Sequence, residues 1–565
     1  MKKPTCILGL NYLSHDSSAS LLRDGEVIAS AMEERFTRVK QDRVFPMNAI
    51  NFCLAYGKIT IADLECITFY MDPEENFEQK MRYAASNYPQ TWPIFNTLLQ
   101  GALDLKGIEK DIRDRLQYFG KIYFCNHHDA HIAESFFLSE FQNCAMLVAD
   151  GLGEITSTVL ATVDGNQFTR LRTVDFPHSL GMLYNALTHY LGFNAISDPG
   201  KVMGLSSYGD SAVFIKAFRK IVKLQNNGTY ELDLSYFEYP YRRDVWISEI
   251  FSKAFGPRRL PGEPIEKRHE DIAAALQLAV EEAIFHMAKF LKDTTKKHYL
   301  CLGGGVALNS VANGKLLEKG WFKDIFVPPA PGDDGTSIGS ALYYHYCVLQ
   351  NTKRHPLRNA YLGTEYSNDE ILKTITKFRL VKYHKSINVC KETAALLTQN
   401  KIIGWFQGRM EIGPRALGNR SIIANPGLRN AQDILNARVK FREPFRPFAP
   451  SILVEEIKNW FSFDHSSAYM LFVFDIKKEK RGLIPGVTHV DGSGRLQSVG
   501  KSDNPRYYKL ISEFNKLSGI PMVINTSFNV AGEPIIESPA GAIRCFLGNG
   551  LDYLVMGDYI LEKHT

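Results

Sequence analysis

Residues able to bind a metal ion gather in three short segments of the first half of the chain. His127 and His131 are four positions apart, so on a helix they share one face and can hold one ion. Asp150 ends an apolar run before Gly151, and Asp333 lies in the run PGDDG. Acids placed beside glycine at strand ends are typical ligands of a metal or a metal-bound phosphate. These four side chains are the predicted ligands of one metal site.

The same residues also have ordinary structural roles. An HxxxH pair arises readily on a helix surface or at a helix cap, and Asp334 suits a turn or helix cap. As a ligand set, two imidazoles and two carboxylates suit Fe(II), Mn(II) or Zn(II) better than calcium. The residue types alone leave the choice among these metals open.

A glycine run at 303–305 follows an apolar segment and precedes the start of a helix. Glycines there let backbone amides approach a phosphate or a base, and the helix presents its positive end. The run matches neither the dinucleotide fingerprint nor the Walker loop, and tight strand–helix packing is the alternative. The segment HSLGMLY, which carries Gly181, and the segment DPGK, which ends at Lys201, are expected to line the same cleft.

Arginines set among glycines mark the second half of the chain. The segment GRMEIGPRALGNRS spans 408–421, KFREPFR spans 440–446, VDGSGR spans 490–495 and NTSFN spans 525–529. A solvated charged face is the usual explanation of basic residues, and it suits 477–481. It suits GPRALGNRS poorly, because apolar residues and glycines alternate with the charges. Guanidinium groups in such a setting indicate a pocket for phosphate oxygens.

The elements that position these residues are predicted to be α/β. A strand, a polar loop and a β-hairpin occur at 6–32 and again at 144–176, which suggests a duplicated unit like that of the actin-like and sugar-kinase superfamily. Amphipathic stretches are expected at 82–105, 127–138, 180–192 and 270–293. The polar, aperiodic segment 350–365 is the expected boundary, which gives domains at 1–352 and 360–565.

Composition limits the classes of function. A chain of 565 residues is too long for one core, and its net charge of +5 includes no basic block, so we expect no nucleic-acid partner. The nine cysteines form no CxxC pair, which indicates reduced thiols and no zinc ribbon. The N-terminal apolar run is short and impure, and no apolar run of 18 residues follows, so we expect a cytoplasmic protein without a membrane partner.

These motifs together resemble the O-carbamoyltransferases of the nodulation and antibiotic-biosynthesis type, over essentially the whole chain. The matching segments are LNYLSHDSSASLLRDG, MEERFTRVK, NHHDAH, VADG, SLGMLYNALTHYLGF, GGGVALN, PGDDGTSIG, GRMEIGPRALGNRS and INTSFN. The resemblance implies an ATPase-like (ASKHA) N-terminal domain followed by a YrdC-like C-terminal domain.

The resemblance also implies the chemistry of each domain. The C-terminal domain is expected to convert carbamoyl phosphate and ATP, with Mg²⁺, into carbamoyl-adenylate. The implied residues are Arg415, Lys440, Arg446 and Arg495, with Asn525 and Ser527 as polar contacts. The N-terminal domain is expected to transfer the carbamoyl group beside Fe(II) bound by His127, His131, Asp150 and Asp333. The residues expected to face the nucleotide are Gly181, Lys201, Gly304, Gly305 and Asn309.

His15 is the implied general base for the acceptor hydroxyl, because an unperturbed imidazole titrates near neutrality. A locally satisfied loop histidine is the alternative. The acceptor, a hydroxylated small molecule, is not identified by the sequence, and segments 75–120 and 208–262 are expected to contact it. A homodimer is left open. Rival functions are tRNA threonylcarbamoylation, hydrogenase maturation (disfavoured because zinc-finger cysteine pairs are absent) and non-catalytic nucleotide sensing.

Overall fold

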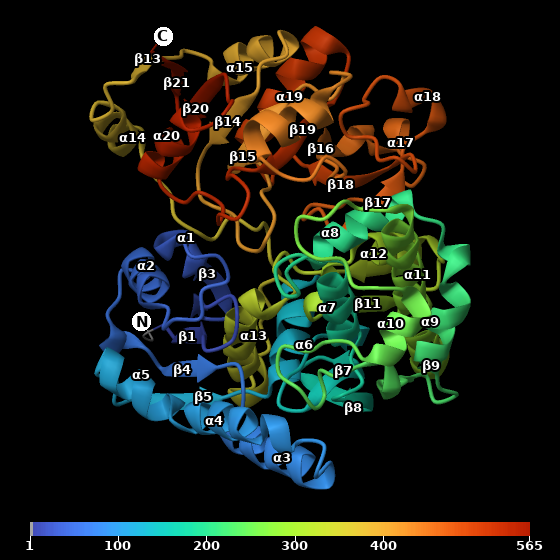
Figure 1. The fold of residues 1–565 in the computed structure, drawn as a ribbon. Helices are drawn as coiled ribbons and strands as arrows, with labels where there is room; N and C mark the ends of the chain where they lie inside the picture. The colour runs from blue at the N-terminus through green and yellow to red at the C-terminus, as the bar shows by residue number, and fades with distance from the viewer. Residues whose placement is uncertain (1–3, 565) are drawn as a thin grey trace. The chain divides into compact units, whose positions relative to one another are not determined.

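The structure is a computed structural model that describes residues 4–564 (Figure 1). The chain forms two compact units. The first contains residues 4–30, 43–312 and 319–357, and the second contains residues 31–42, 313–318 and 358–564. The predicted α/β class is confirmed, because each unit combines mixed sheets with helices. Two short segments that precede the expected boundary at 350–365 therefore fold with the second unit.

Two five-stranded sheets organise the first unit. The first has the order β3-β2-β1-β4-β5, with strands β1 (Cys6–Asn11), β2 (Ser18–Arg23), β3 (Glu26–Met32), β4 (Cys66–Phe69) and β5 (Lys121–Phe124). The second has the order β12-β11-β6-β7-β8, with strands β6 (Asn143–Ala149), β7 (Thr156–Asp164), β8 (Gln167–Asp175), β11 (Tyr299–Gly303) and β12 (Asp324–Phe326).

Strand pairing is the same in both sheets. The central strands β1 and β6 each pair antiparallel with the next strand and parallel with a later one, β4 or β11. The hairpin turns contain Gly25 and Gly165, whose φ angles of 88° and 60° favour glycine. The predicted repeat of strand, loop and hairpin is therefore confirmed by topology.

Helix α6 (His127–Leu138) carries both candidate histidine ligands and is buried almost throughout. Asn126 caps it by accepting hydrogen bonds from the amides of His128 and Asp129. Helix α13 (Thr336–Tyr343) packs against it so closely that a Cβ at Gly339 would lie 2.0 Å from the carbonyl oxygen of Ala130. The close packing fixes α6 relative to the loop that precedes α13.

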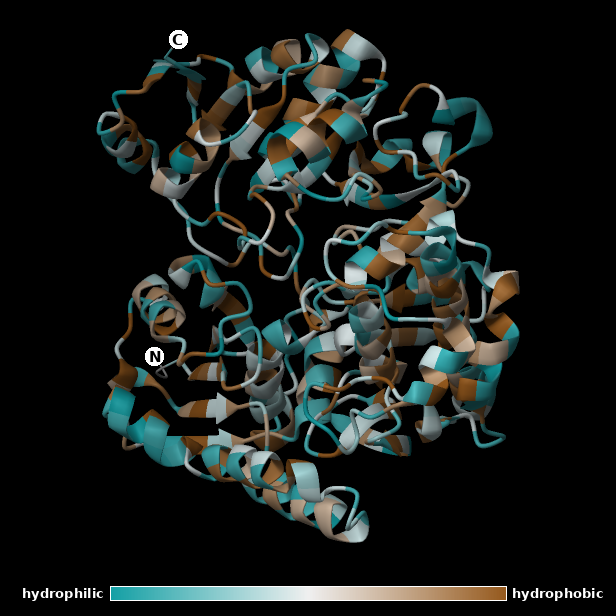
Figure 2. Cartoon of the chain, viewed as in Figure 1, coloured by the Kyte–Doolittle hydropathy of each residue, from teal (hydrophilic) through white to brown (hydrophobic). Residues whose placement is uncertain are grey.

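The remaining longer helices of this unit are α2 (Met47–Gly57), α3 (Pro73–Ser86), α4 (Phe95–Lys106), α5 (Ile108–Leu116), α7 (Leu180–Tyr190), α8 (Pro199–Leu205), α9 (Ile215–Ile221), α10 (Glu249–Phe255) and α11 (Lys267–Thr295). Helix α12 (Ser310–Glu318) begins in this unit, but its residues 313–318 belong to the second. The prediction of one stretch at 82–105 is wrong, because the chain leaves the helix between α3 and α4, where Pro89 and Pro93 cannot continue it. Figure 2 shows α5 as mostly hydrophilic, with Ile108 and Ile112 buried. Among residues 4–564, no helix combines the length and apolar composition needed to cross a bilayer.

The second unit is built on a nine-stranded mixed sheet with the order β13-β21-β20-β14-β15-β19-β16-β18-β17. Its strands are β13 (Val381–Lys385), β14 (Ile403–Phe406), β15 (Arg420–Ala424), β16 (Ala449–Leu453), β17 (Phe472–Asp475), β18 (Ser493–Val499), β19 (Met522–Ser527), β20 (Tyr553–Met556) and β21 (Tyr559–Lys563). The longer helices are α14 (Asn368–Ile375), α15 (Val389–Thr398), α19 (Pro505–Ser518) and α20 (Pro539–Leu547).

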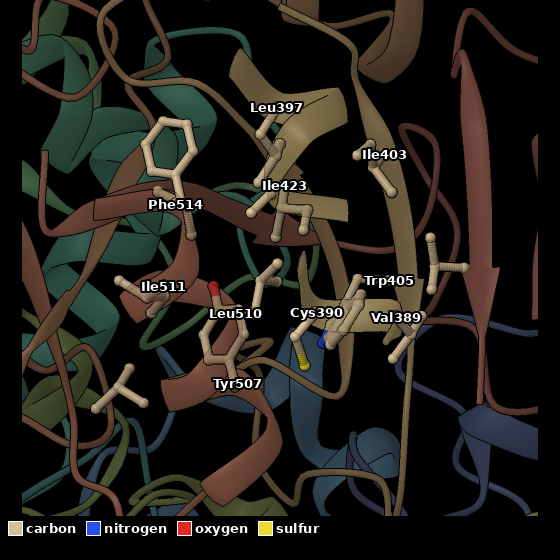
Figure 3. Close-up of a cluster of buried hydrophobic side chains, with 14 of the residues drawn as sticks. Val389, Cys390, Leu397, Ile403, Trp405, Ile423, Tyr507, Leu510, Ile511 and Phe514 are labelled. Atoms are coloured by element: carbon tan, nitrogen blue, oxygen red, sulfur yellow. The ribbon is translucent and has the colours of Figure 1, made fainter. Parts of the chain in front are cut away.

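Helices α15 and α19 cover one apolar core of this sheet, shown in Figure 3. Trp405 of β14 and Tyr507 of α19 are fully buried there. The indole N–H of Trp405 donates to the carbonyl of Gly418 at 2.9 Å. The core is thus tied directly to the loop that contains GPRALGN.

Candidate active sites

A cluster of four buried side chains lies at the carboxyl end of β6. The ligand atoms of His127, His131, Asp150 and Asp333 all lie within 4.8 Å of one another. Nε2 of His127 is 3.0 Å from Oδ2 of Asp150 and 3.2 Å from Nε2 of His131. Oδ1 of Asp333 is 3.8 Å from Nε2 of both histidines. The structure brings together the four residues that the sequence singled out as ligands.

The geometry of the cluster fits a divalent metal ion. Ligand atoms about 2.1 Å from a common ion lie roughly 3 to 4 Å apart, which is the spacing seen here. Burial disfavours the charged forms of both partners, yet mutual attraction prevails. The pKa of His131 rises to about 10 because hydrogen bonds and charges of Asp150 and Asp333 outweigh burial, and attraction to the histidines lowers the pKa of Asp150. The four side chains are therefore arranged to stabilise a positive charge between them.

Several contacts hold the two aspartates in place. The amide of Gly305 donates to Oδ1 of Asp150 at 2.9 Å, and the hydroxyl of Ser14 donates to Oδ2 of Asp333, also at 2.9 Å. The side-chain amide of Asn11 donates to the Asp333 carbonyl at 2.6 Å. These contacts come from the ends of β1 and β11, the central strand of one sheet and a parallel neighbour in the other.

Glu154 supports the cluster, and sequence reasoning missed it. Its buried carboxylate accepts hydrogen bonds from the amides of His127 and Asp72 at 3.0 and 3.1 Å and from the side-chain amide of Asn126. It therefore fixes the first turn of α6, where the metal-facing histidines begin. A glutamate four residues after Asp150 was the only signal in the sequence.

His15 lies beside the cluster, with its ring partly exposed. Its Nδ1 is 2.8 Å from Oδ2 of Asp16, and its Nε2 is 4.0 Å from Oδ2 of Asp333. Burial lowers the pKa of His15, but the Asp333 and Asp16 carboxylates outweigh this effect and raise it to about 10. The position suits contact with a reacting hydroxyl, and the role of general base stays a prediction.

The glycine loops make close backbone contacts. A Cβ at Gly304, whose φ is 79°, would lie 2.3 Å from the Ala149 carbonyl oxygen, and one at Gly181 would lie 2.7 Å from that of Asp150. These two positions therefore need glycine for packing at the end of β6, which is the alternative considered from the sequence. Gly305 serves the cluster through its amide.

Asn309 and Lys201 are both held by side-chain contacts. Asn309 exchanges two hydrogen bonds of 3.0 Å with Gln277 of α11, which also accepts from Tyr184. Lys201 pairs with Asp198 at 3.1 Å. Asn309 and its partner Gln277 form a buried polar network at the start of α12.

The second unit contains a separate cluster of basic side chains: Arg415, Lys440, Arg442, Arg446 and Arg495. Among the described residues, the side chains of Arg415 and Arg495 have no hydrogen-bonding or ion-pair partner. The guanidinium of Arg446 lies 3.7 Å from the carboxylate of Glu443. The cluster therefore carries more positive charge than its own acids neutralise.

Burial and mutual repulsion act on the same groups. Burial, followed by the charge of Arg446, lowers the pKa of Arg415 to about 10 and that of Arg442 to about 9. Burial and the neighbouring arginines also lower the pKa of Arg495 well below its ordinary value. Neighbouring like charges held in a partly desolvated site store an unfavourable energy that a polyanion would relieve. The arrangement supports the anion pocket expected from the sequence.

Two residues of the GRMEIGPRALGNRS segment act as scaffold. Oε1 of Glu411 accepts from the amides of Leu417, Asn419 and Arg420 at 2.7, 2.7 and 3.1 Å. The fully buried guanidinium of Arg420 stacks 3.7 Å over Phe406. It donates to the carbonyls of Thr364, Gln407, Gly408, Asn419 and Glu537. These contacts shape the loop and leave Arg415 as its unpaired cation.

Lys440 and Asn525 are held by hydrogen bonds within the second unit. The Lys440 ammonium donates to the carbonyls of Ser527 and Asn529 at 2.8 and 2.9 Å and to the Ser527 hydroxyl at 3.2 Å. Asn525 donates to the Ala416 carbonyl at 3.0 Å and to Gln497 at 2.9 Å. Lys440, Asn525 and Ser527 thus have partners within the unit, whereas Arg415 does not.

Sequence reasoning missed Arg442 and Gln497. Arg442 joins the cation cluster, and its side chain donates to Asn436 at 2.7 Å. Gln497 links the Asn525 amide to the Leu417 carbonyl. The KFREPFR segment gave a signal for Arg442, whereas nothing local marked Gln497.

Comparison with known proteins decides the family. A model described as "Carbamoyltransferase N-terminus" matches residues 6–342, and one described as "Carbamoyltransferase C-terminus" matches residues 394–563. The chain belongs to the carbamoyltransferase family. The expectation of an enzyme of this family is confirmed.

Three similar proteins illustrate this family. An uncharacterised Synechocystis protein is 39% identical, with 99% of this chain and 97% of that protein covered. The nodulation protein NolNO of Sinorhizobium fredii is 36% identical over 98% of this chain and 80% of its own length. The 3′-hydroxymethylcephem-O-carbamoyltransferase of Streptomyces clavuligerus is 30% identical over 64% of each chain.

Proposed function

We propose that this carbamoyltransferase uses ATP and carbamoyl phosphate to form carbamoyl-adenylate in its second unit and carbamoylates a hydroxyl of a small molecule in its first. The main support is that the side chains of Arg415 and Arg495, within a cluster of five basic residues, have no partner among the described residues. A single phosphate needs fewer cations than this cluster offers, whereas ATP and carbamoyl phosphate together bring several negative charges that repel one another. The cluster offsets that repulsion.

The proposed formation of carbamoyl-adenylate takes two steps. Water and carbamoyl phosphate give carbamate and inorganic phosphate, and a carbamate oxygen then attacks the α-phosphorus of ATP, so that pyrophosphate leaves. Guanidinium groups can bind the phosphate oxygens bidentately and stabilise charge on the leaving groups. Arg415, Arg495 and Arg446 are assigned this role. Lys440 positions the Ser527–Asn529 turn and adds charge, and Mg²⁺ accompanies ATP.

The proposed transfer takes place at the buried cluster of the first unit. His127, His131, Asp150 and Asp333 would hold a divalent ion, proposed to be Fe(II), and the ion supplies positive charge to a carbonyl or phosphate oxygen when bound. The positive charge of a bound ion would offset the Asp333 carboxylate that raises the pKa of His15, so that the neutral imidazole can accept the proton of the acceptor hydroxyl. The hydroxyl oxygen then attacks the carbamoyl carbon while AMP leaves. The network of Asn309 and the loops of Gly181, Gly304 and Lys201 are proposed to contact the adenylate.

The proposal extends to fold relations and partners. We assign the first unit to the actin-like and sugar-kinase type, supported by its two sheets of identical strand order, and the second to the YrdC-like type. The name of the cephem relative supports a hydroxyl acceptor. The acceptor class is a hydroxylated natural product or sugar.

The test combines a required donor with a panel of acceptors. Purified full-length chain is incubated with ATP, Mg²⁺, Fe(II), carbamoyl phosphate and hydroxylated metabolites, and mass spectrometry monitors the mass of one added carbamoyl group. We expect product only when both ATP and carbamoyl phosphate are present, together with AMP and pyrophosphate. Formation of ADP in place of AMP would contradict the adenylate intermediate.

A further inference from the structure

The segment MEERFTRVK matches the family motifs, yet the proposed mechanism gives it no role. Its residues follow β3 in the N-terminal half of the chain, but residues 31–42 fold as part of the second unit. A short helix, α1 (Glu34–Thr37), forms the centre of the segment. Its side chains contact the two loops that carry the basic pocket.

Arg35 contacts the loop that contains Arg415. Its Nη2 donates to the carbonyl oxygen of Gly413 at 3.0 Å, and its Nη1 pairs with Glu34 at 2.7 Å. Arg35 is 5% exposed, so this pairing and the hydrogen bond are largely shielded from water. Gly413 lies two positions before Arg415. This hydrogen bond therefore holds the backbone that leads into Arg415.

Arg38 contacts a second loop, which also bonds to Lys440. Its two terminal nitrogens donate to the carbonyls of Pro534 and Ile535, each at 2.7 Å. Ile535 packs with Met410 and Ala416 in one buried apolar cluster. A guanidinium that bonds two consecutive carbonyls uses a fork geometry that a lysine ammonium cannot reproduce.

The Arg38-bound loop also holds Lys440. The Asn529 carbonyl accepts from the Lys440 ammonium at 2.9 Å, and the amide of Ala531 donates to the Lys440 carbonyl at 3.1 Å. A shift of the 529–535 loop would therefore move Lys440. Through Arg35 and Arg38, residues 33–42 contact both loops that define the positions of Arg415 and Lys440.

The backbone of the segment is strained and internally braced. Arg38 has a φ of 63° and Gln41 a φ of 56°, the left-handed region that side-chain-bearing residues rarely occupy. Oε2 of Glu34 accepts from the amide of Gln41 at 2.7 Å, and the Thr37 hydroxyl donates to Asp42, also at 2.7 Å. Strain of this kind persists where surrounding contacts impose it, frequently at functional sites.

We propose that Arg35 and Arg38 are positioning residues of the activation pocket, so that this pocket is completed by residues 33–42 of the N-terminal half. The inference rests on the proposed function of the pocket. It predicts that the C-terminal family domain, residues 394–563, lacks part of its own working site. It also gives the segment MEERFTRVK a role, although no side chain of this segment is assigned to the reaction itself.

The test uses the full chain and lysine variants that keep the charge. Arg35→Lys and Arg38→Lys are compared with Arg43→Lys, because Arg43 is a nearby exposed arginine outside the second unit. We expect the KM for carbamoyl phosphate in pyrophosphate release to rise roughly tenfold in the first two variants, because losing such a contact costs about 1.4 kcal/mol. The control should match the wild type. Wild-type KM values in both pocket variants would overturn the inference.

A second variant separates positioning from folding. Arg38→Gly removes the guanidinium, yet glycine is favoured at a φ of 63°, so the thermal midpoint should stay near that of the wild type. We expect weaker pyrophosphate binding by calorimetry and partial rescue by added methylguanidinium. A lower thermal midpoint with unchanged pyrophosphate affinity would show a purely structural role. Calorimetry needs no turnover, so absent wild-type activity would count against the proposed function and leave the inference testable.

Discussion

Arg415 and Arg420 lie five residues apart in one motif, and their replacement by methionine should change stability in opposite directions. Burial lowers the pKa of both guanidinium groups to about 10, so the pKa does not distinguish them. Their contacts do. Arg415 has no partner among the described residues, whereas Arg420 donates to five carbonyl oxygens. The pair therefore provides a matched comparison of a binding cation and a scaffold cation.

The magnitude follows from the same contacts. At about 1.36 kcal/mol for each pKa unit, the lowered pKa of Arg415 corresponds to at most roughly 3 kcal/mol of unfavourable charge burial at neutral pH. Relaxation and water penetration reduce this, so Arg415→Met should raise the free energy of unfolding by about 1 to 2 kcal/mol. Arg420→Met leaves buried carbonyls without donors, at about 1 to 3 kcal/mol each, and should lower it by more than about 3 kcal/mol.

Urea unfolding followed by tryptophan fluorescence measures the effect. Trp405 and Trp460 are buried in the second unit and report on its unfolding. Because a two-unit chain need not unfold in one step, the midpoints of the transitions are compared. Excess pyrophosphate should raise the wild-type midpoint and change that of Arg415→Met far less. A midpoint for Arg415→Met as low as that of Arg420→Met, with a wild-type response to pyrophosphate, would refute the assignment.

Three further predictions concern both sites. His127→Ala and Asp333→Ala should each reduce bound metal in elemental analysis while pyrophosphate release continues; a wild-type metal content in either variant would disprove the ligand set. Glu411→Gln should lower the unfolding free energy of the second unit by about 1 to 2 kcal/mol, because three amides lose a charged acceptor. The urea midpoint of that unit should fall accordingly, and an unchanged midpoint would exclude this scaffold role. Burial and the charges of Arg442 and Arg446 lower the pKa of Lys440, so pyrophosphate affinity measured by calorimetry should fall as pH rises through that lowered pKa and the ammonium is lost. Lys440→Met should remove this pH dependence, and its persistence would assign it to another group.

Local patterns in the sequence were sufficient for much of the first unit. Alternating apolar residues around Asp-Gly turns defined both hairpins, and the HxxxH spacing placed two imidazoles on one helix face. The error at 82–105 arose because the periodic pattern was followed through two prolines. Asp150 and the loop that carries Asp333 lie together because they follow β6 and β12, which run parallel in one sheet and end at the same edge.

The basic pocket shows what local patterns cannot predict. Sequence alone identified arginines among glycines. It could not show that the Arg420 guanidinium is hydrogen-bonded to backbone carbonyls while the Arg415 side chain has no partner among the described residues. Those partners lie as far as 117 positions away in the sequence. Gln497 and the folding of residues 31–42 with the second unit depend on equally distant contacts.

Exchange of radiolabelled pyrophosphate into ATP by the wild-type chain shows whether the basic cluster forms carbamoyl-adenylate. If the basic pocket forms carbamoyl-adenylate with release of pyrophosphate, the reverse reaction must incorporate label into ATP. We expect exchange that requires carbamoyl phosphate, is lost in Arg415→Met and persists in His127→Ala. Exchange that is absent, or that proceeds equally well without carbamoyl phosphate, would contradict it.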